Sequence, residues 1–220
     1  MTRGIISFVF DDGYSEIMSD ALPLLEKYKI KATIAVPIET EKVAKTENSN
    51  VSSLSSWKEY CFKKGHELGA HGKNHSPLST LSEEQIRQDL SESKTATNAS
   101  SLIYPGGAFD PRVKRIATEY FSSARTTKRG FETFPPKDKY ELCTFNATQK
   151  NFAPWKWNFW ALRAMVENKW LIETFHHVNH PDKIHSVQLT ELEAHIKFIN
   201  QLPIRIATIG QVISENKVAQ

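Results

Sequence analysis

The chain has 220 residues and a mass of 25.1 kDa, and 40% of its residues are hydrophobic, which suits a single domain spanning residues 1–220. Its 28 basic and 25 acidic residues leave a net charge of +3 without a basic tract, so nothing points to nucleic acid as a partner. Two cysteines cannot form a disulfide framework, and we expect Cys61 and Cys143 to be free thiols.

The first residues lead directly into an apolar run, and no apolar stretch of the sequence is long enough to span a bilayer. We therefore expect a cytoplasmic protein if Met1 is the native start, or an exported protein whose signal has been removed. The sequence leaves the oligomeric state open.

Apolar runs alternate with segments of helical periodicity along the chain. Strands are expected at residues 5–10, 31–37, 66–72, 102–107, 121–127, 170–177 and 204–209. Helices are expected at residues 15–28, 54–64, from 82 onwards, 110–120, 154–169 and 190–202. Pro23 should kink the first helix or split it into two pieces, and Ser82 with Gln85 should form a capping box on the third. Residues 39–53 are polar and indicate an exposed, mobile excursion.

Strands that alternate with helices indicate parallel βαβ units. Seven strands favour an α/β fold built as a distorted or incomplete (β/α) barrel over an open sheet. In such folds, functional side chains gather at the carboxyl ends of the strands. Here those ends carry Asp11-Asp12, His71 to His75, Tyr104 to Gly107, Arg125 to Thr127, and His176-His177.

Two of these strand ends favour a metal site. Asp11 and Asp12 would repel each other if both were desolvated, and a nearby cation removes that difficulty. His71 and His75 lie four residues apart, so two imidazoles can reach one ion if the chain between them turns. A carboxylate would complete a set of three ligands with open positions. A solvated Asp-Gly turn and two ordinary loop histidines are the alternatives.

Several motifs together make the sequence recognisable. They are Phe10-Asp11-Asp12-Gly13, the stretch from Gly65 to Leu78 with Trp57 before it, Tyr104-Pro105-Gly106-Gly107, and Leu171 to His176. With these motifs the chain resembles the polysaccharide deacetylase family (carbohydrate esterase family four) from residue 5 to about residue 210. The resemblance implies a metal-binding barrel that removes N-acetyl groups from an amino sugar of a polysaccharide, oligosaccharide or glycolipid precursor.

The resemblance also implies residue roles. Asp12, His71 and His75 would hold a divalent metal, usually zinc, although iron, cobalt, nickel or manganese suit the same set. Asp11 would act as the general base, and His176 would protonate the leaving amine. An amide needs both, since its amine leaves only when protonated.

Further residues are expected near the substrate. Backbone N–H groups near Gly106 would hold the oxyanion, with Tyr104 beside them. His177 is the alternative acid, because the strand period places it and His176 on opposite faces. The aromatic stretch 155–160 favours core packing over sugar stacking, and Trp155 is the member expected nearest solvent.

The chain departs from the family pattern at Ile103, where the family usually has an arginine that pairs with the base. It resembles a variant branch of the family with Tyr-Pro-x-Gly at this motif. Our hypothesis is that Arg125 replaces the missing arginine as the partner of Asp11, although a phosphate or sugar contact is the alternative. Arg129 is interpreted as a solvated charge.

The remaining histidines are not expected to take part in catalysis or metal binding. His66 is expected to be structural, and His180, His185 and His195 are expected on the surface or in loops. The functional alternatives are hydrolysis of a small non-sugar amide, a catalytically inactive carbohydrate-binding barrel, and a metalloregulatory protein. The last would give no reason for Asp11 and His176 to accompany the metal ligands.

Overall fold

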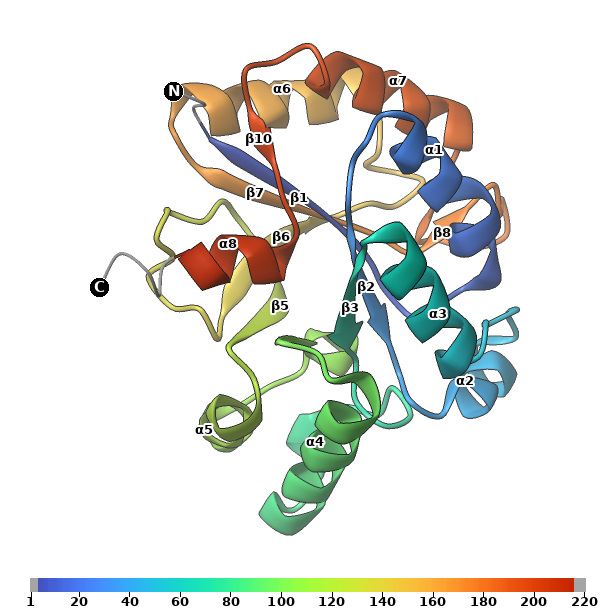
Figure 1. Cartoon of the computed structure of the whole chain (residues 1–220), viewed down its shortest axis with the longest axis vertical. Coiled ribbons are helices and arrows are strands. Elements are labelled where there is room, and N and C mark those ends of the chain that lie inside the picture. Colours follow the sequence, from blue (N-terminus) through green and yellow to red (C-terminus); the bar gives the residue numbers. More distant parts are fainter. Residues whose placement is uncertain (1–3, 216–220) are drawn as a thin grey trace.

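The structure is a computed structural model that describes residues 4–215. Eight parallel strands form one sheet in the order β10-β1-β2-β3-β4-β5-β6-β7, and β1 also pairs with β7, which closes a ring of seven strands (Figure 1). The strands of this sheet are β1 (Ile5–Phe10), β2 (Thr33–Val36), β3 (Glu67–Ala70), β4 (Ser101–Ile103), β5 (Ser123–Arg129), β6 (Leu142–Asn146), β7 (Trp170–Phe175) and β10 (Arg205–Ile206). After β7, a separate two-stranded sheet contains β8 (His177–Val178) and β9 (Ser186–Val187).

The expected α/β barrel of about seven parallel strands is confirmed, and its distortion has a visible cause. Strand β1 pairs with β10 through Ile5 and Ile6, but with β2 through Val9 and Phe10. The barrel is therefore split along one side at its amino-terminal end. The apolar pattern does not predict β6, because Leu142 is the only large aliphatic residue in a strand of five.

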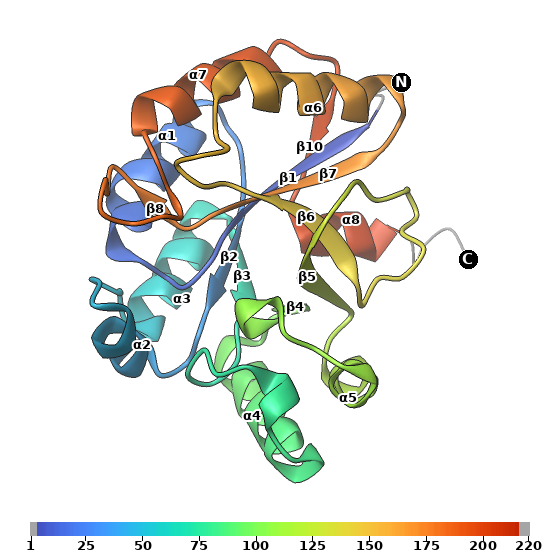
Figure 2. The same cartoon turned by 180° about the vertical axis from the view of Figure 1, so that it is seen from behind.

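Helices surround the barrel, as the view from behind also shows (Figure 2). They are the π-helical turn η1 (Ile17–Ala21), α1 (Leu22–Lys27), α2 (Thr40–Glu47), α3 (Leu54–Lys64), α4 (Glu83–Thr97), α5 (Pro111–Tyr120), α6 (Pro154–Val166), α7 (Leu189–Ile199) and α8 (Ile209–Glu215), with 3₁₀ turns η2 (Leu78–Thr80) and η3 (Pro105–Gly107). Between residues 4 and 215, no helix combines the length and the apolar character that crossing a bilayer requires.

Local sequence explains where several helices begin and end. The predicted capping box is present, with the Ser82 hydroxyl accepting from the Gln85 backbone and the Gln85 side chain accepting from the Ser82 backbone. Pro23 lies at the start of α1, directly after the π-helical turn η1, and the backbone stays helical from Ala21 through Leu22. The break expected at Pro23 therefore takes the form of a π-helical turn inside one continuous helix. The predicted excursion at residues 39–53 contains α2 instead. Its helical pattern is hard to detect, because only Thr40 and Val43 are buried among charged residues.

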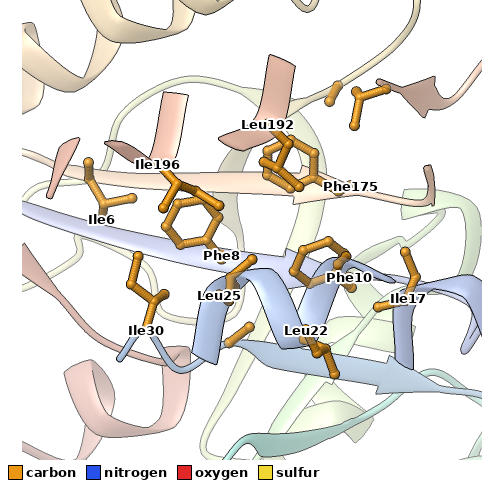
Figure 3. Packing of buried hydrophobic residues seen from close by; sticks show 14 of the residues in the cluster. Ile6, Phe8, Phe10, Ile17, Leu22, Leu25, Ile30, Phe175, Leu192 and Ile196 are labelled. Carbon is orange, nitrogen blue, oxygen red and sulfur yellow. The ribbon is translucent and has the colours of Figure 1, made fainter. Parts of the chain in front are cut away.

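Strand β1 separates two parts of the core. Its side chains at Ile6, Phe8 and Phe10 point away from the barrel axis and pack against α1 and α7 (Figure 3). Ile5 and Val9 belong to a different cluster of buried residues that fills the barrel. Because side chains alternate along a strand, Asp11 lies on the same side as Val9, at the carboxyl end of the barrel.

Helix α8 closes the opposite end of the barrel. The Ile209 N–H donates to the Thr33 hydroxyl at 3.1 Å, and the Gly210 N–H donates to the Glu67 carboxylate at 2.8 Å. Thr33 and Glu67 are the first residues of β2 and β3, so these contacts fix α8 at the amino-terminal end. The carboxyl end is left for the functional side chains.

The structure corrects one histidine and confirms another. His195 is fully buried, not a surface residue, with Nε2 at 3.0 Å from the Glu173 carboxylate and Nδ1 at 2.7 Å from Asn158 Oδ1. It borders the apolar face of α7, which explains its burial. His66 is structural as expected, because its Nδ1 accepts the Ala32 N–H at 3.1 Å. Cys61 and Cys143 are free thiols, as expected.

Candidate metal and catalytic site

The two aspartates reach one site because the chain turns between them. The Asp11 N–H still continues the sheet, donating to the Phe175 carbonyl at 3.0 Å. Asp12 then adopts a left-handed conformation with φ of 71°, followed by Gly13 at 74°. Adjacent strand residues would point to opposite faces, but this turn brings both carboxylates to the barrel mouth, each 3% exposed. Non-glycine residues in this region of φ and ψ are uncommon, and functional sites are where they collect.

Two imidazoles face the same oxygen of Asp12. His71 Nε2 lies 3.2 Å from Asp12 Oδ1, and His75 Nε2 lies 3.3 Å from it. His71 directly follows β3, whereas His75 reaches the site through a left-handed conformation with φ of 61°. The three ligand atoms lie within 4.8 Å of one another. His71 Nδ1 contacts the Ile103 carbonyl at 2.8 Å, which leaves Nε2 as the nitrogen that faces Asp12.

These residues fit a divalent metal ion. Asp12 Oδ1 is buried and has no hydrogen-bond partner among residues 4–215, which is costly for a carboxylate unless a cation satisfies it. Burial alone would raise the pKa of Asp12, but the nearby imidazoles of His71, His176 and His75 hold that pKa well below its usual value. Burial lowers the pKa of His75, which favours the neutral form that binds metals. One carboxylate oxygen and two imidazole nitrogens are a donor set for zinc and its neighbours in the first transition row.

Arg125 contacts Asp11, as the hypothesis from the sequence requires. Its Nη2 donates to Asp11 Oδ2, and its Nη1 donates to the Thr126 carbonyl at 3.2 Å. Arg125 is 1% exposed, so the pair is buried. In the sheet register, Arg125 of β5 is the direct partner of Ile103 of β4. The guanidinium therefore enters from the strand next to the one where the family usually has its arginine, and at the same level.

His176 faces the two aspartates, whereas His177 also lines the cavity but turns its ring towards Glu16. His176 Nε2 is 3.7 Å from Asp11 Oδ2, and burial lowers the pKa of His176 despite the two aspartates. His177 instead contacts Glu16 at 2.6 Å and stacks on the Tyr14 ring, with centroids 3.7 Å apart. Glu16, His177 and His180 form a second group of ligand atoms within 4.8 Å.

The motif at Tyr104 forms the turn η3 beside the site. Gly106 has a φ of 59° and lines the cavity, while the Gly107 N–H is bonded to the Tyr104 carbonyl at 2.8 Å. The Tyr104 N–H donates to the Arg125 carbonyl, and its hydroxyl donates to the Tyr140 carbonyl. Tyr104 thus lines the cavity with both donors already in use. That Tyr104 and Gly106 contact the substrate stays a prediction.

A cavity of about 450 Å³ joins these groups at the barrel mouth. Glu47, Lys183 and His185 also line it, and the sequence reading missed all three. Glu47 lies at the end of α2 with Oε1 at 3.5 Å from His75 Nδ1, and the Lys183 amine donates to the Glu47 carbonyl at 2.9 Å. Glu47 ends α2, whereas Lys183 and His185 lie in the loop between β8 and β9, and no motif marks these three residues.

Trp155 does not line this cavity. Its side chain is 76% exposed on α6, consistent with its expected place nearest solvent. Trp157 of the same helix is buried in the core, which favours the core interpretation for that residue. A role for Trp155 in binding sugar stays a prediction.

Comparisons with known proteins identify relatives of this chain. The family model for polysaccharide deacetylases matches residues 1–121. A bifunctional xylanase/deacetylase of Pseudobutyrivibrio xylanivorans is 33% identical over 86 residues, which are 39% of this chain and 13% of that protein. The chain therefore corresponds to a small part of that relative's length.

Solved structures share the fold at low sequence identity. The Xyl-CE4 domain of a multidomain xylanase from the hindgut metagenome of Trinervitermes trinervoides has a TM-score of 0.66 at 17% identity, covering 98% of this chain and 92% of that one. A family 4 acetyl xylan esterase from Clostridium thermocellum, solved with a cobalt ion, has a TM-score of 0.63 at 15% identity, covering 97% and 92%. A CE4 family pseudoenzyme from Bacillus anthracis has a TM-score of 0.61 at 15% identity, covering 96% and 66%.

Proposed function

Because its first 121 residues match the family model, the chain belongs to the polysaccharide deacetylase family, and we propose that it removes N-acetyl groups from an amino sugar with a divalent metal. The substrate class is a polysaccharide, oligosaccharide or glycolipid precursor. One observation carries the proposal: the buried pair of Asp11 and Arg125 lies beside the ligand atoms of Asp12, His71 and His75. A metal site without hydrolytic chemistry would give no reason for a second buried carboxylate with its own cation.

The proposed roles divide the reaction between metal and protein. When bound, the divalent ion polarises the acetyl carbonyl and lowers the pKa of water, so that a nucleophile exists near neutral pH. Asp11 accepts the proton of the attacking water. The Arg125 guanidinium holds the Asp11 carboxylate in place and stabilises its charge in a buried site.

The second proton transfer falls to His176. Its Nε2 lies within 4 Å of both aspartates, on the wall of the same cavity. Burial lowers its pKa, so the protonated ring gives up its proton readily to the leaving amine. Its Nδ1 is buried and has no hydrogen-bond partner in the described part of the chain. The resemblance to the family implies an acidic residue that tunes this histidine, and residues 125–130 contain none.

Zinc is the metal we propose first, with iron, cobalt, nickel or manganese as alternatives. A carboxylate and two imidazoles with open positions form a catalytic zinc set, but affinity and availability decide among these ions.

A second candidate is hydrolysis of an O-acetyl ester on a xylan-like polymer. It is favoured by the names of the relatives, which include a xylanase/deacetylase and an acetyl xylan esterase. An alkoxide leaves more easily than an amine, so an ester would demand less of His176. An inactive binding barrel is less well supported, because Asp11 is present and paired with Arg125.

The decisive experiment is acetate release from a panel of substrates, with and without a chelator. The panel holds N-acetylated sugars, N-acetylated polymers, lipid-linked precursors, acetylated xylan and small non-sugar amides. We expect release from an N-acetylated sugar substrate that stops with chelator and returns with zinc. Release that survives thorough chelation would exclude the metal, and release from acetyl xylan or small amides alone would transfer the proposal to those substrates.

A matched pair of variants separates base from metal. Asp11→Asn should abolish turnover and keep the metal, whereas Asp12→Asn should lose both. If Asp11→Asn retains full turnover, Asp11 is not the base.

A further inference from the structure

A second, smaller cavity of about 170 Å³ adjoins the cavity at the barrel mouth. The two share Thr127 and Asn146 as lining residues. Arg129 and Lys156 line only the smaller cavity, which we call the cationic pocket. A substrate seated at the metal ligands can therefore extend across the shared wall into it.

The positive charges of the cationic pocket lack acidic partners. Within residues 4–215, neither Arg129 nor Lys156 forms an ion pair with a carboxylate, although most arginines of that part of the chain do. Helix α6 adds to the positive field, because it begins beside the pocket with Ala153 at its cap and no acidic residue in its first turn.

Arg129 is held in place by aromatic rings. Its guanidinium carbon lies 5.1 Å from the Phe145 centroid and 5.5 Å from the Trp160 centroid. Such stacking leaves the N–H groups at the edge of the guanidinium free to bind a planar or tetrahedral anion. Arg163 also lies over the Trp160 ring, at 5.6 Å, but pairs with Glu167. Two guanidinium groups thus occupy Trp160, which makes it a support for Arg129 and not a platform for sugar.

The shared wall carries an unused acceptor. Asn146 Oδ1 is buried and finds no hydrogen-bond partner within residues 4–215. An amide in that position can bind a sugar hydroxyl between the two cavities. The residues shared by the two cavities, Thr127 and Asn146, can therefore bind a sugar hydroxyl, and the cationic pocket can bind an anion.

We propose that the cationic pocket binds an anionic substituent, a carboxylate or a phosphate, carried by the acetylated sugar or by its neighbour in the substrate. This inference rests on the proposed function for the sugar at the metal ligands. It specifies the substrate as an acidic glycan or glycan precursor. Arg129 supplies paired N–H donors to the anion, and Lys156 supplies a point charge.

The test is a titration of the protein with three sugars that differ in charge, in which NMR spectra measure binding. The probes are N-acetylglucosamine, N-acetylmuramic acid, which adds a carboxylate, and N-acetylglucosamine 6-phosphate. We expect at least one acidic sugar to bind about tenfold more tightly than the neutral one, with a preference that shrinks as salt is added. The carboxylate and phosphate probes distinguish the two kinds of anion. Free acetate appears in the same spectra, so failure of turnover is seen separately from failure of binding.

Variants tie the preference to the cationic pocket. Arg129→Gln and Lys156→Gln should each reduce the preference and leave the affinity for N-acetylglucosamine unchanged. Arg163→Gln is the matched control, because Arg163 also stacks on Trp160 but does not line the pocket. The proposal is overturned if both acidic sugars bind no more tightly than the neutral one. It is also overturned if neither acidic sugar binds. It is also overturned if Arg163→Gln removes the preference equally, or if neither pocket variant changes it. Lys156 makes no stacking contact, so its variant serves if Arg129→Gln fails to fold.

Discussion

Replacing Arg125 with alanine tests the least expected feature of the site. Arg125 is 1% exposed and Asp11 is 3% exposed, and the guanidinium donates directly to Asp11 Oδ2. The substitution leaves a buried carboxylate without its counterion. Breaking a buried ion pair from one side costs about 3–5 kcal/mol. For a domain of this size, that corresponds to a fall in melting temperature of roughly 6–20 °C.

The structure places the expected loss of stability near the lower end of that range. Asp11 lines the cavity of about 450 Å³, so water can enter and solvate the carboxylate once the guanidinium is gone. The effect on turnover should be larger, because a misplaced or protonated Asp11 cannot act as base. General-base catalysis contributes about 10²- to 10⁴-fold, and we expect a loss in kcat of that order.

The assay compares acetate release, metal content and thermal unfolding in wild type, Arg125→Ala and Arg125→Lys. The metal content of Arg125→Ala should not fall below that of wild type, because Arg125 is not a metal ligand. Its positive charge repels a cation, so its removal does not weaken metal binding. Arg125→Lys keeps the charge but loses the forked geometry, so it should recover part of the turnover. Unchanged turnover in Arg125→Ala, or turnover lost only in step with lost metal, would refute the reasoning.

Three further predictions concern other residues. His195→Ala should cost about 3–5 kcal/mol in urea unfolding, because it leaves the Glu173 carboxylate buried without its partner; a cost below about 1 kcal/mol would show that water or relaxation satisfies Glu173. Burial lowers the pKa of His66 in the folded chain below its ordinary value of 6.5. As the pH falls below about 6.5, the unfolded chain therefore binds more protons at this residue than the folded chain does. In that pH range the free energy of unfolding decreases by at most about 1.4 kcal/mol per pH unit. His66→Gln should flatten that part of the stability profile, and an identical slope in the variant would assign the dependence to other groups. Trp155→Ala should leave kcat and KM on short substrates unchanged, since Trp155 does not line the cavity; a raised KM would make it a sugar contact.

The positions of the metal ligands after strands were enough to predict that they share one site. The carboxyl ends of parallel strands in a barrel meet at one end, so Asp12 after β1 and His71 after β3 are neighbours whatever the loops do. The same rule placed Arg125 and His176 at the site. The left-handed conformations of Asp12 and His75 lay outside the pattern, and the one at Asp12 removes the apparent conflict between adjacent aspartates on opposite faces.

The features that sequence reading missed depend on loops and on contacts between distant residues. Glu47 approaches His75 because α2 folds from a segment with only two buried side chains, too few for a clear apolar pattern. His195 falls at a helical spacing on the buried face of α7, but its partner Glu173 lies on β7, and the sequence does not show this contact between distant residues. Arg129 is exposed, in agreement with its interpretation as a solvated charge, but its stacking on Phe145 and Trp160 was missed, because these rings come from β6 and α6, far away in the sequence.

The central claim is that Asp12, His71 and His75 share one divalent ion. Crystals of the wild-type protein soaked with zinc or cobalt, measured at the absorption edge of the metal, test it most directly. We expect one strong anomalous peak within about 2.0–2.2 Å of Asp12 Oδ1 and the Nε2 atoms of both histidines, and loss of that peak in Asp12→Asn. Crystals in which the metal binds elsewhere, or in which these three side chains stay uncoordinated in excess metal, would contradict it.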